Sequence, residues 1–286
     1  MKRVLVTGGS GFVGRHLIRG LLDRYPDIKV TSLSRSESVI SQLLMYCEDK
    51  RLKIIMADVR DFAAVDYALG GIDTVLHLAA MKRVDLSEEN CREATSINVI
   101  GTMNLLKAFR GDTFVLMSTD KAVEPVNCYG ATKLVAEKLV LEQARKSNKG
   151  CRFMIVRLGN VMGSTGSVWE IWKHQIEENN EITVTDLDMR RFYISVEEVV
   201  KLYINVLDRG ENGKVYFAPC GEAVVLRDLV QKAIQLYGNE NTKIRVVGLR
   251  SGERMQEKIR RADETNTIAG FEETVEAREV GKRTEI

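Results

Sequence analysis

Short apolar runs that alternate with longer amphipathic stretches constrain the fold of this 286-residue chain more than any other feature. The apolar runs are nearly continuous, which is typical of strands buried on both faces of a parallel sheet. Right-handed crossovers would then place the amphipathic helices on both faces. The sequence predicts an α/β protein, a doubly wound parallel Rossmann sheet with a smaller C-terminal substrate lobe. The predicted strands lie near residues 4–6, 30–33, 53–56, 74–78, 113–117 and 153–157.

This pattern loosens after residue 157, which indicates a second unit. A helix at 196–208 is predicted to return to the first unit. The elements predicted for the second unit are a helix with Trp169 and Trp172, a strand at 215–217, a helix near 226–237 and a strand at 243–247. We therefore predict a Rossmann domain of residues 1–160 with 193–212, and a second lobe of residues 161–192 and 213–286.

The composition is that of an ordinary globular protein, because 44% of residues are apolar, 29% are charged and the net charge is +2. There is no like-charge block for nucleic acid, no apolar run long enough for a bilayer and no signal peptide. We predict a cytoplasmic protein without a nucleic-acid or membrane partner. The scattered cysteines (Cys47, Cys91, Cys128, Cys151 and Cys220) and the three distant histidines predict neither a disulfide nor a metal site.

A glycine-spaced loop, residues 7–14, joins the first predicted strand to the first helix. Gly8 permits a tight turn, Gly11 lets the backbone approach a pyrophosphate, and Gly14 lets the helix pack closely on the sheet. The helix N-terminus would face the phosphates. Such a loop alone is a weak signal, but its place after the first strand favours dinucleotide binding. The predicted contacts here are Thr7, Gly8, Ser10, Gly11, Phe12 and Val13.

The end of the second predicted strand, Ser34-Arg35-Ser36, bears on which dinucleotide binds. An NAD enzyme would place an acidic residue here for the ribose 2′-hydroxyl, whereas hydroxyls and an arginine suit a 2′-phosphate. We therefore predict NADP, with NAD the less favoured cofactor; the alternative is that Arg35 is a solvated surface residue. Further predicted cofactor contacts are Asp58 and Val59 near the adenine, and Leu78, Ala79 and Ala80 along the cofactor.

A short stretch, Ser118-Thr119-Asp120-Lys121 followed by Tyr129 and Lys133, carries the candidate chemistry. Tyr129 and Lys133 lie one helical turn apart and share a face. The ammonium group should favour the phenolate and lower a pKa that is otherwise roughly 10. Such a pair can take a proton from a sugar hydroxyl while hydride leaves the same carbon. A plain alcohol dehydrogenase does not need Asp120 and Lys121, whose alternative interpretation is a solvated ion pair.

The glycine loop and the Tyr-xxx-Lys pair together resemble the extended short-chain dehydrogenase/reductase family. The finer signatures resemble the inverting UDP-N-acetylglucosamine 4,6-dehydratases (5-epimerising) of pseudaminic-acid and capsule pathways, over residues 1 to about 260. In chain order they are Ser34-Arg35, Ala57-Asp58-Val59-Arg60-Asp61, Ala79-Ala80-Met81-Lys82, Ser118-Thr119-Asp120-Lys121-Ala122, Tyr129-Gly130-Ala131-Thr132-Lys133, Gly159-Asn160-Val161, Gly166-Ser167-Val168, Arg191-Phe192, and the Gly248, Arg250, Gly252 and Glu253 motif.

The resemblance implies a role for each matching position. Tyr129 would be the base for C4 oxidation, Lys133 would hold it and the nicotinamide ribose, and Thr119 would bond the C4 oxygen. Asp120 would protonate the leaving C6 hydroxyl, and Lys121 would abstract the C5 proton and manage its return. The other implied contacts are Asn98 with the cofactor, Lys82 with cofactor and substrate, Asn160, Arg191 and Arg250 with the diphosphate, and Glu253 with the uridine ribose.

The implied reaction converts UDP-N-acetylglucosamine to UDP-2-acetamido-2,6-dideoxy-β-L-arabino-hex-4-ulose. A transient C4 ketone acidifies the C5 hydrogen, water leaves from C5–C6, hydride returns to C6, and protonation from the opposite face inverts C5. An acid and a base must flank C5–C6, and Asp120 and Lys121 can supply them. For Lys121 to act as base its pKa must fall from roughly 10.4, and burial and the charge of Lys133 would both lower it.

Four places depart from the usual pattern of the family: Arg83, Glu124, Arg190 and Trp169-Glu170. We expect them around the sugar pocket, where they reflect either neutral change or a changed sugar. The alternative functions are a split-pathway partner acting on the 5,6-ene sugar, a C4 epimerase or 4-ketoreductase, and a sensor that holds NADP without turnover. Helices near 89–110 and 128–148 could pair across a two-fold axis, so we also predict a homo-oligomer, a dimer or higher.

Overall fold

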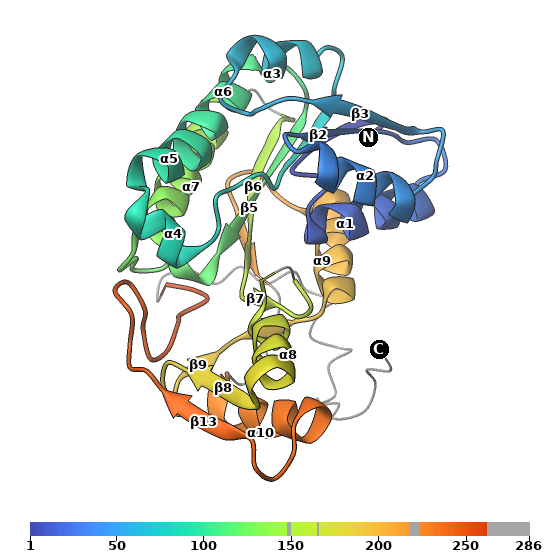
Figure 1. Cartoon of the computed structure of the whole chain (residues 1–286). Coiled ribbons are helices and arrows are strands. Elements are labelled where there is room, and N and C mark those ends of the chain that lie inside the picture. The colour runs from blue at the N-terminus through green and yellow to red at the C-terminus, as the bar shows by residue number, and fades with distance from the viewer. Residues whose placement is uncertain (148–149, 165, 218–222, 262–286) are drawn as a thin grey trace.

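The computed structural model describes residues 1–147, 150–164, 166–217 and 223–261 (Figure 1). Cys220 and residues 262–286, which belong to the predicted second lobe, lie outside the described residues. Within the described part of the chain no helix is long and apolar enough to cross a membrane.

The described residues form a central sheet of seven strands in the order β11-β6-β5-β4-β1-β2-β3, and every pair in it is parallel. This confirms the predicted parallel Rossmann sheet. The order reverses direction between β1 and β4, and ligands of such sheets bind at that switch point. The strands are β1 Arg3–Thr7, β2 Lys29–Ser34, β3 Leu52–Met56, β4 Thr74–His77, β5 Thr113–Thr119, β6 Arg152–Leu158 and β11 Val215–Phe217.

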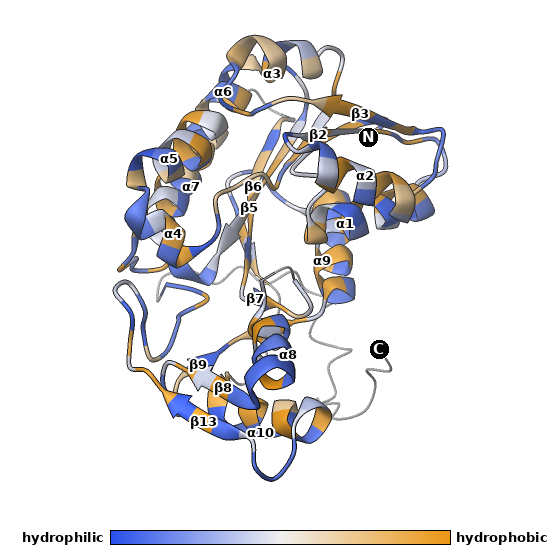
Figure 2. Cartoon of the chain, in the orientation of Figure 1, coloured by the Kyte–Doolittle hydropathy of each residue, from blue (hydrophilic) through white to orange (hydrophobic). Residues whose placement is uncertain are grey.

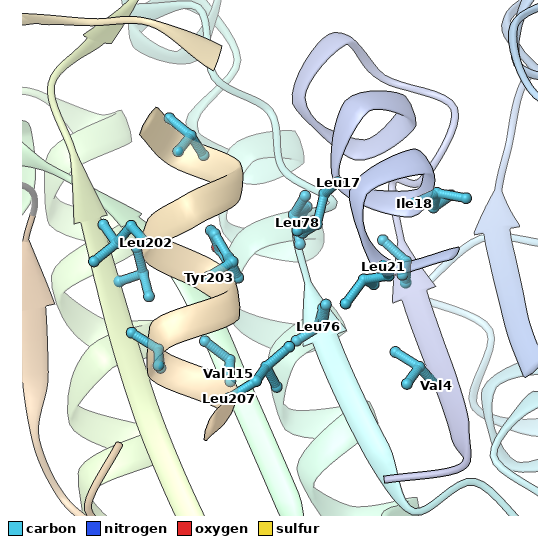
Figure 3. Packing of buried hydrophobic residues seen from close by; sticks show 14 of the residues in the cluster. Val4, Leu17, Ile18, Leu21, Leu76, Leu78, Val115, Leu202, Tyr203 and Leu207 are labelled. Carbon is cyan, nitrogen blue, oxygen red and sulfur yellow. The ribbon is translucent and has the colours of Figure 1, made fainter. Parts of the chain in front are cut away.

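Helices cover both faces of the sheet, which explains why its strands are apolar throughout. Along β1, Val4 and Val6 belong to one core cluster and Leu5 belongs to the other. Figure 3 shows the first cluster, to which one helix contributes Leu17 and Leu21 and another contributes Leu202 and Tyr203. On this face lie α1 Phe12–Arg24, α2 Glu37–Tyr46 and α9 Val196–Arg209; on the other lie α3 Phe62–Ala68, α6 Gly101–Ala108 and α7 Cys128–Lys146.

The helix expected over residues 89–110 is confirmed for residues 91–108, but it contains a π-helical turn. α5 Cys91–Thr95, the π turn η1 Ser96–Ile100 and α6 follow one another without a break, and the short helix α4 Val84–Glu89 precedes them. A π turn holds an extra residue in its hydrogen-bonded ring and is frequent at functional sites. Asn98 in this turn is 1% exposed and points into the protein, where it bonds to the main chain of Met81.

A third core cluster, separate from the two on the sheet, lies between α8 Val168–Asn179 and α10 Leu226–Tyr237. Trp172 and Val230 are each 1% exposed in it. Figure 2 shows both helices with apolar and polar stretches, as expected for helices with one buried face. Three two-stranded sheets complete this region: β8 Glu181–Val184 with β13 Lys243–Val246, β9 Arg190–Arg191 with β12 Val224–Val225, and β10 Tyr193–Ile194 with β7 Asn160–Val161.

The strand at 215–217 corrects the domain boundary predicted at residue 213. It is β11, which pairs with β6 at the edge of the main sheet rather than within the second lobe. Its three residues, Val215, Tyr216 and Phe217, are all buried. α9 precedes this strand in the chain and shares a core cluster with Tyr216. A short apolar strand stays buried here because the sheet offers it a partner edge. The rest of the two-domain division remains a prediction.

Candidate active site

A cavity of about 550 Å³ lies where the ends of β4, β5 and β6 meet the second lobe. Its walls come from strand ends, from the start of α7, from the second lobe and from residues 250–257. This is the sheet edge at which parallel α/β folds bind ligands. The predicted site residues that line it are Val13, Leu78, Ala80, Lys82, Thr119, Lys121, Tyr129, Lys133, Asn160, Arg191, Arg250 and Glu253.

The loop after β1 has a shape that only glycine permits at two positions. Gly8 has a φ of +68°, and a Cβ there would lie 2.9 Å from the Ala79 amide nitrogen. A Cβ on Gly14 would lie 2.4 Å from the Gly8 carbonyl oxygen. Gly11, which precedes α1, provides no side-chain cap, so the first amides of the helix through Phe12 and Val13 remain available to an anion. The cradle fits a dinucleotide pyrophosphate.

Thr7 is placed beneath this loop and not at its surface. Its hydroxyl lies 2.7 Å from His77 Nδ1 and accepts a hydrogen bond from the Ala79 amide at 3.2 Å. His77 Nε2 in turn lies 2.9 Å from the Thr102 hydroxyl. Thr7 and His77 are both buried, so the predicted cofactor contact at Thr7 is instead a structural link between β1 and β4. His77 packs within the core, as its lone position in the sequence suggested.

His77 should make the protein less stable in acid. Burial, with the charge of Lys133, lowers its pKa from 6.5 to about 3. Between about pH 6.5 and 3, His77 is therefore protonated in the unfolded chain but neutral in the folded chain. The free energy of unfolding falls as the pH drops through this range. The expected slope is up to about 1.4 kcal/mol per pH unit. Urea unfolding of His77→Gln should lack this part of the slope.

The exposed His174 provides the matched control for that measurement. His174→Gln should keep the acid slope of the parent protein. Equal slopes in the parent and in His77→Gln would contradict the assignment.

At the predicted adenosine end, the three residues after β2 have different environments. Ser34 is buried, and its hydroxyl accepts a hydrogen bond from the Ser10 amide at 3.1 Å. Arg35 is 61% exposed, with its Nη1 3.5 Å from Asp58 Oδ2. The Ser36 hydroxyl is exposed and lies 3.0 Å from that of Ser38. Arg35 and Ser36 are therefore accessible to a phosphate, whereas the buried Ser34 hydroxyl is already hydrogen-bonded to Ser10 of the glycine loop.

Asp58 and Val59 also differ in position. Hydrogen bonds from Arg60 lower the pKa of Asp58 to about 2, so its carboxylate is charged. Val59 is 4% exposed, and its side chain packs in the core close to Gly101. An adenine could therefore meet the carboxylate of Asp58, but not the side chain of Val59.

Asn98, a predicted cofactor contact, instead links the segment after β4 to α7 by side-chain hydrogen bonds. Its amide nitrogen donates to the Met81 carbonyl at 3.1 Å and to the Thr132 hydroxyl at 2.9 Å. Its oxygen accepts from the Met81 amide at 2.8 Å. Both donor hydrogens are thereby used, because the π turn directs Asn98 inward. It fixes the segment that carries Ala80 and Lys82, and burial lowers the pKa of Lys82 there.

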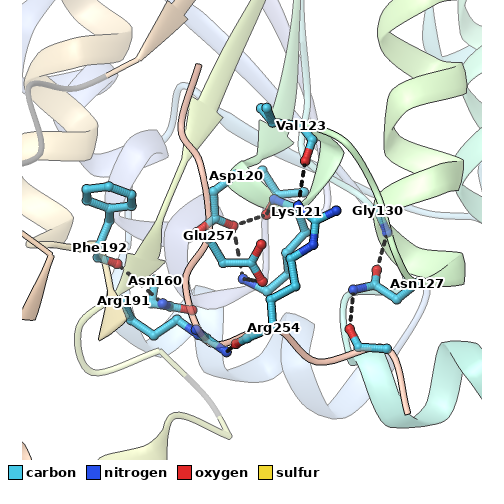
Figure 4. A network of polar contacts seen from close by, with 12 residues as sticks. Asp120, Lys121, Val123, Asn127, Gly130, Asn160, Arg191, Phe192, Arg254 and Glu257 are labelled. Carbon is cyan, nitrogen blue, oxygen red and sulfur yellow. Dashed lines mark hydrogen bonds and ion pairs between the residues drawn. The ribbon is translucent and has the colours of Figure 1, made fainter. Parts of the chain in front are cut away.

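The four groups Thr119, Asp120, Lys121 and Glu257 form one polar cluster (Figure 4). Asp120 Oδ1 accepts from the Thr119 hydroxyl and from Lys121 Nζ, both at 2.9 Å. Asp120 is completely buried, and its Oδ2 has no hydrogen-bond partner among the described residues. A buried carboxylate oxygen without a partner is costly and is expected where a ligand completes the site.

Tyr129 and Lys133 lie together on α7 and both line the cavity, as their spacing predicted. The expectation that the lysine lowers the pKa of the phenol is wrong for the chain alone. Burial raises the pKa of Tyr129 above its usual range, the hydrogen bond with Thr119 opposes this, and the charge of Asp120 adds to it. Burial also lowers the pKa of Lys133 to about 8, against the charge of Glu137. In the chain alone, burial is the largest cause of the pKa shift of both groups.

The predicted diphosphate ligands occupy the opposite wall. Arg191 is 9% exposed, and three of its donor contacts go to the main-chain carbonyls of residues 190, 254 and 255. Its guanidinium therefore mainly fixes residues 250–257 against β9. Asn160 donates to the Phe192 carbonyl at 3.3 Å, and Arg250 and Glu253 line the cavity beside each other.

Sequence reasoning missed Glu257, which is 3% exposed and lines the cavity. Its neighbours in sequence are charged and look like a solvated segment, so no local signal marks it. Among the departures from the family pattern, Arg83 and Trp169 line the cavity, whereas Glu124 forms an ion pair with Lys258 on the surface. Arg190 is exposed in β9. In the described residues no group of three or more His, Cys, Asp or Glu could hold a metal ion.

The chain matches known proteins along most of its length, and several of them are named enzymes. The sequence profile of the polysaccharide biosynthesis protein family matches residues 4–279. An uncharacterized membrane protein of Methanocaldococcus jannaschii is 35% identical over 90% of this chain and 80% of its own. UDP-N-acetylglucosamine 4,6-dehydratase (inverting) of Campylobacter jejuni is 34% identical over 95% and 81%. UDP-glucose 4-epimerase of Rickettsia bellii is 33% identical over 92% and 79%.

Solved structures agree with these relatives. Pen from Bacillus thuringiensis is 37% identical, with a TM-score of 0.86 over 90% of this chain and 80% of that chain. DesIV, a dTDP-glucose 4,6-dehydratase from Streptomyces venezuelae with NAD and TYD bound, is 25% identical, with a TM-score of 0.81 over 90% and 88%. The chain therefore belongs to the polysaccharide biosynthesis protein family, among the nucleotide-sugar dehydratases and epimerases of the extended short-chain dehydrogenase/reductases.

Proposed function

We propose that the protein is an NADP-dependent lyase, the inverting 4,6-dehydratase of UDP-N-acetylglucosamine. The observation that carries this proposal is that Thr119, Lys121, Tyr129 and Lys133 line one cavity. Asp120 is buried behind them, bonded to Thr119 and Lys121, and one of its oxygens has no partner among the described residues. An acid and a base next to the oxidising pair are what elimination of water requires. The relative from Campylobacter jejuni supports the same activity.

The chain's own residues would divide the proton transfers. Tyr129 would take the proton of the sugar O4, and Thr119, hydrogen-bonded to it, would hold that oxygen. A bound NADP⁺ would supply the two-electron oxidation of C4 and its later reversal at C6. Lys121 would remove the acidified C5 proton, and Asp120 would give a proton to the leaving C6 hydroxyl. Lys133 would orient the cofactor ribose and Tyr129 from the adjacent turn of α7.

For the cofactor, the glycine cradle and the solved relative with NAD bound support a nicotinamide dinucleotide. Arg35 supports NADP, because its exposed guanidinium can pair with a 2′-phosphate. Proposed contacts of this cofactor also include the backbone of Gly8, Ser10 and Gly11.

Replacing Arg35 should weaken NADP binding selectively. Arg35→Ser should raise the Kd of NADP⁺ by about 10- to 100-fold, since it removes charge-assisted hydrogen bonds of about 1.5–3 kcal/mol. The Kd of NAD⁺ should change by less than about threefold, because NAD lacks the 2′-phosphate. Calorimetric titration of both cofactors measures the difference. The exposed Arg19→Ser on α1 is the control, and a parallel loss of both cofactors in Arg35→Ser would contradict NADP selectivity.

The proposed substrate would lie across the cavity, with its diphosphate toward Asn160, Arg191 and Arg250 and its uridine ribose toward Glu253. Incubation with UDP-N-acetylglucosamine in heavy water, followed by proton NMR, tests the activity. We expect a 4-keto-6-deoxy sugar of the L-configuration with deuterium at C5 and no net consumption of reduced cofactor. An unchanged sugar would overturn the proposal.

Two other activities remain candidates on specific observations. C4 epimerisation is supported by relatives named UDP-glucose 4-epimerase, and it needs Thr119, Tyr129 and Lys133 only. A split-pathway partner acting on the 5,6-ene sugar is supported by Arg83 and Trp169, which line the cavity and differ from the usual pattern. A C4 epimer in the NMR experiment supports the first, and reaction only with the 5,6-ene supports the second.

We also propose a cytoplasmic homo-oligomer, a dimer or higher. Ile100, Met103 and Val135 are 43%, 46% and 45% exposed on η1, α6 and α7, the helices predicted to pair. Apolar side chains left exposed in this way are suited to a protein–protein interface.

A further inference from the structure

Glu257 lies beside Lys121, the lysine of the site. Its Oε1 is 4.0 Å from Lys121 Nζ, and the same nitrogen donates to Asp120 Oδ1 at 2.9 Å. Glu257 is 3% exposed and Asp120 is fully buried, whereas Lys121 reaches the cavity. Figure 4 shows Asp120, Lys121 and Glu257 close together, with a dashed line from the ammonium group to Asp120. One carboxyl is adjacent in sequence, and the other comes from the far end of the chain.

The segment that carries Glu257 is held on both sides of the cavity. The Arg190 amide donates to the Met255 carbonyl at 2.8 Å, and Arg191 Nη2 donates to the Arg254 carbonyl at 2.8 Å. On the opposite side, Asn127 Nδ2 donates to the Gly252 carbonyl at 2.8 Å. Asn127 is also the N-cap of α7, which carries Tyr129 and Lys133. The position of Glu257 is therefore fixed by contacts to β9 and to the start of the catalytic helix.

The charged groups that face Glu257 come from three elements. Lys121 and Asp120 belong to the short helical turn after β5, Arg191 to β9, and Arg254 to its own segment. Burial raises the pKa of Glu257; Lys121 opposes this, Asp120 adds to it, and the two arginines oppose it. A carboxyl group of this kind can hold a proton nearer neutral pH than an ordinary glutamate.

We propose that Glu257 is a positioning residue that acts through Lys121, by holding Nζ next to Asp120 and by accepting the proton that Lys121 takes from the sugar. In that transfer one N–H bond of the ammonium breaks, its electron pair remains on Nζ, and an O–H bond forms on Glu257. Lys121 is then a free amine for the next turnover, and the carboxyl passes the proton to water. Tyr129 and Glu257 release their protons to water, Asp120 takes one back from it, and C5 receives its new proton from water on the opposite face. The inference rests on the proposed function.

The kinetic test is Glu257→Gln, which keeps the shape and removes the proton acceptor. The expected kcat falls by about 100-fold, the usual size of an acid–base contribution, while KM for UDP-N-acetylglucosamine changes by less than about threefold. The acid limb of the kcat profile, where protonated Glu257 can accept nothing, should disappear in this variant. Glu257→Asp should recover part of the loss.

Lys258→Gln is the matched control, because it changes the next residue and breaks only an ion pair whose side chains are 59% and 57% exposed. Its kcat should stay within about twofold of the parent, because exposed ion pairs contribute little free energy. A Glu257→Gln enzyme with the kcat and acid limb of the parent would overturn the role of Glu257. A parent enzyme that forms no keto-sugar would overturn the proposed function instead.

A second readout does not depend on turnover. Carboxyl ¹³C NMR of glutamate-labelled protein, with the Glu257 signal assigned by its loss in Glu257→Gln, gives its titration midpoint. We expect a midpoint above the ordinary value of 4.5, and a further rise in Lys121→Met, because the lysine charge lowers it. A Glu257 signal that titrates with the other glutamates and ignores Lys121→Met would overturn the inference, whatever the substrate.

Discussion

Lys121→Met should lose at least 1,000-fold in the rate of water loss, on the order of a full general-base contribution, while C4 oxidation survives. The side chain keeps its length but can no longer take the C5 proton. Thr119, Tyr129 and Lys133, which would act at C4 in the proposed reaction, are unchanged and line the same cavity. In single turnover we expect reduced nicotinamide to accumulate, seen by its absorbance, because hydride cannot return to C6 until the alkene forms.

The control for this variant is Lys138→Met, which replaces an exposed lysine of α7. It should form the keto-sugar at the parental rate by proton NMR. A Lys121→Met enzyme that dehydrates the sugar within tenfold of the parent would assign the C5 base elsewhere, and an intact C4 epimerase activity would favour the alternative function.

Arg157→Met should destabilise the fold by about 3–5 kcal/mol, the cost of leaving a buried charge without its partner. Arg157 on β6 donates to Glu137 on α7 through Nε at 2.8 Å and Nη2 at 2.7 Å. The two side chains are 0% and 1% exposed, so water cannot solvate Glu137 once the arginine is removed. Urea unfolding should show a lower midpoint with an unchanged slope.

Two further variants test whether the loss of stability comes from the unpaired buried charge. Glu142→Gln breaks an exposed pair on the same helix, with side chains 67% and 47% exposed, and should cost less than about 1 kcal/mol. The double variant Glu137→Leu with Arg157→Met removes both charges and should regain much of the lost stability. An Arg157→Met protein as stable as Glu142→Gln would show that Glu137 finds another partner.

The elements that the sequence predicted well are those set by local pattern. Continuous apolar runs, the glycine loop and the Tyr129–Lys133 spacing each depend on residues a few positions apart, and the parallel sheet and the pair on α7 followed from them. Hydrophobic periodicity and glycine stereochemistry act within one strand or turn, so they can be interpreted without knowing what packs against them.

The features that sequence reasoning missed depend on partners distant in sequence. Pairing with β6 moved the strand at 215–217 into the main sheet, and the π turn directed Asn98 to Met81 and Thr132. Burial of Tyr129, which raises the pKa of its phenol, likewise depends on packing that local spacing does not show.

The sequence by itself determined the Rossmann architecture and the Tyr129–Lys133 pair on one face of α7, because both depend on residues a few positions apart. Only the tertiary structure placed Glu257 against Lys121, because Arg191 and Asn127 hold its segment across the cavity. Burial and electrostatic fields arise from three-dimensional packing, and a charged segment looks the same in sequence whether water or another lobe covers it.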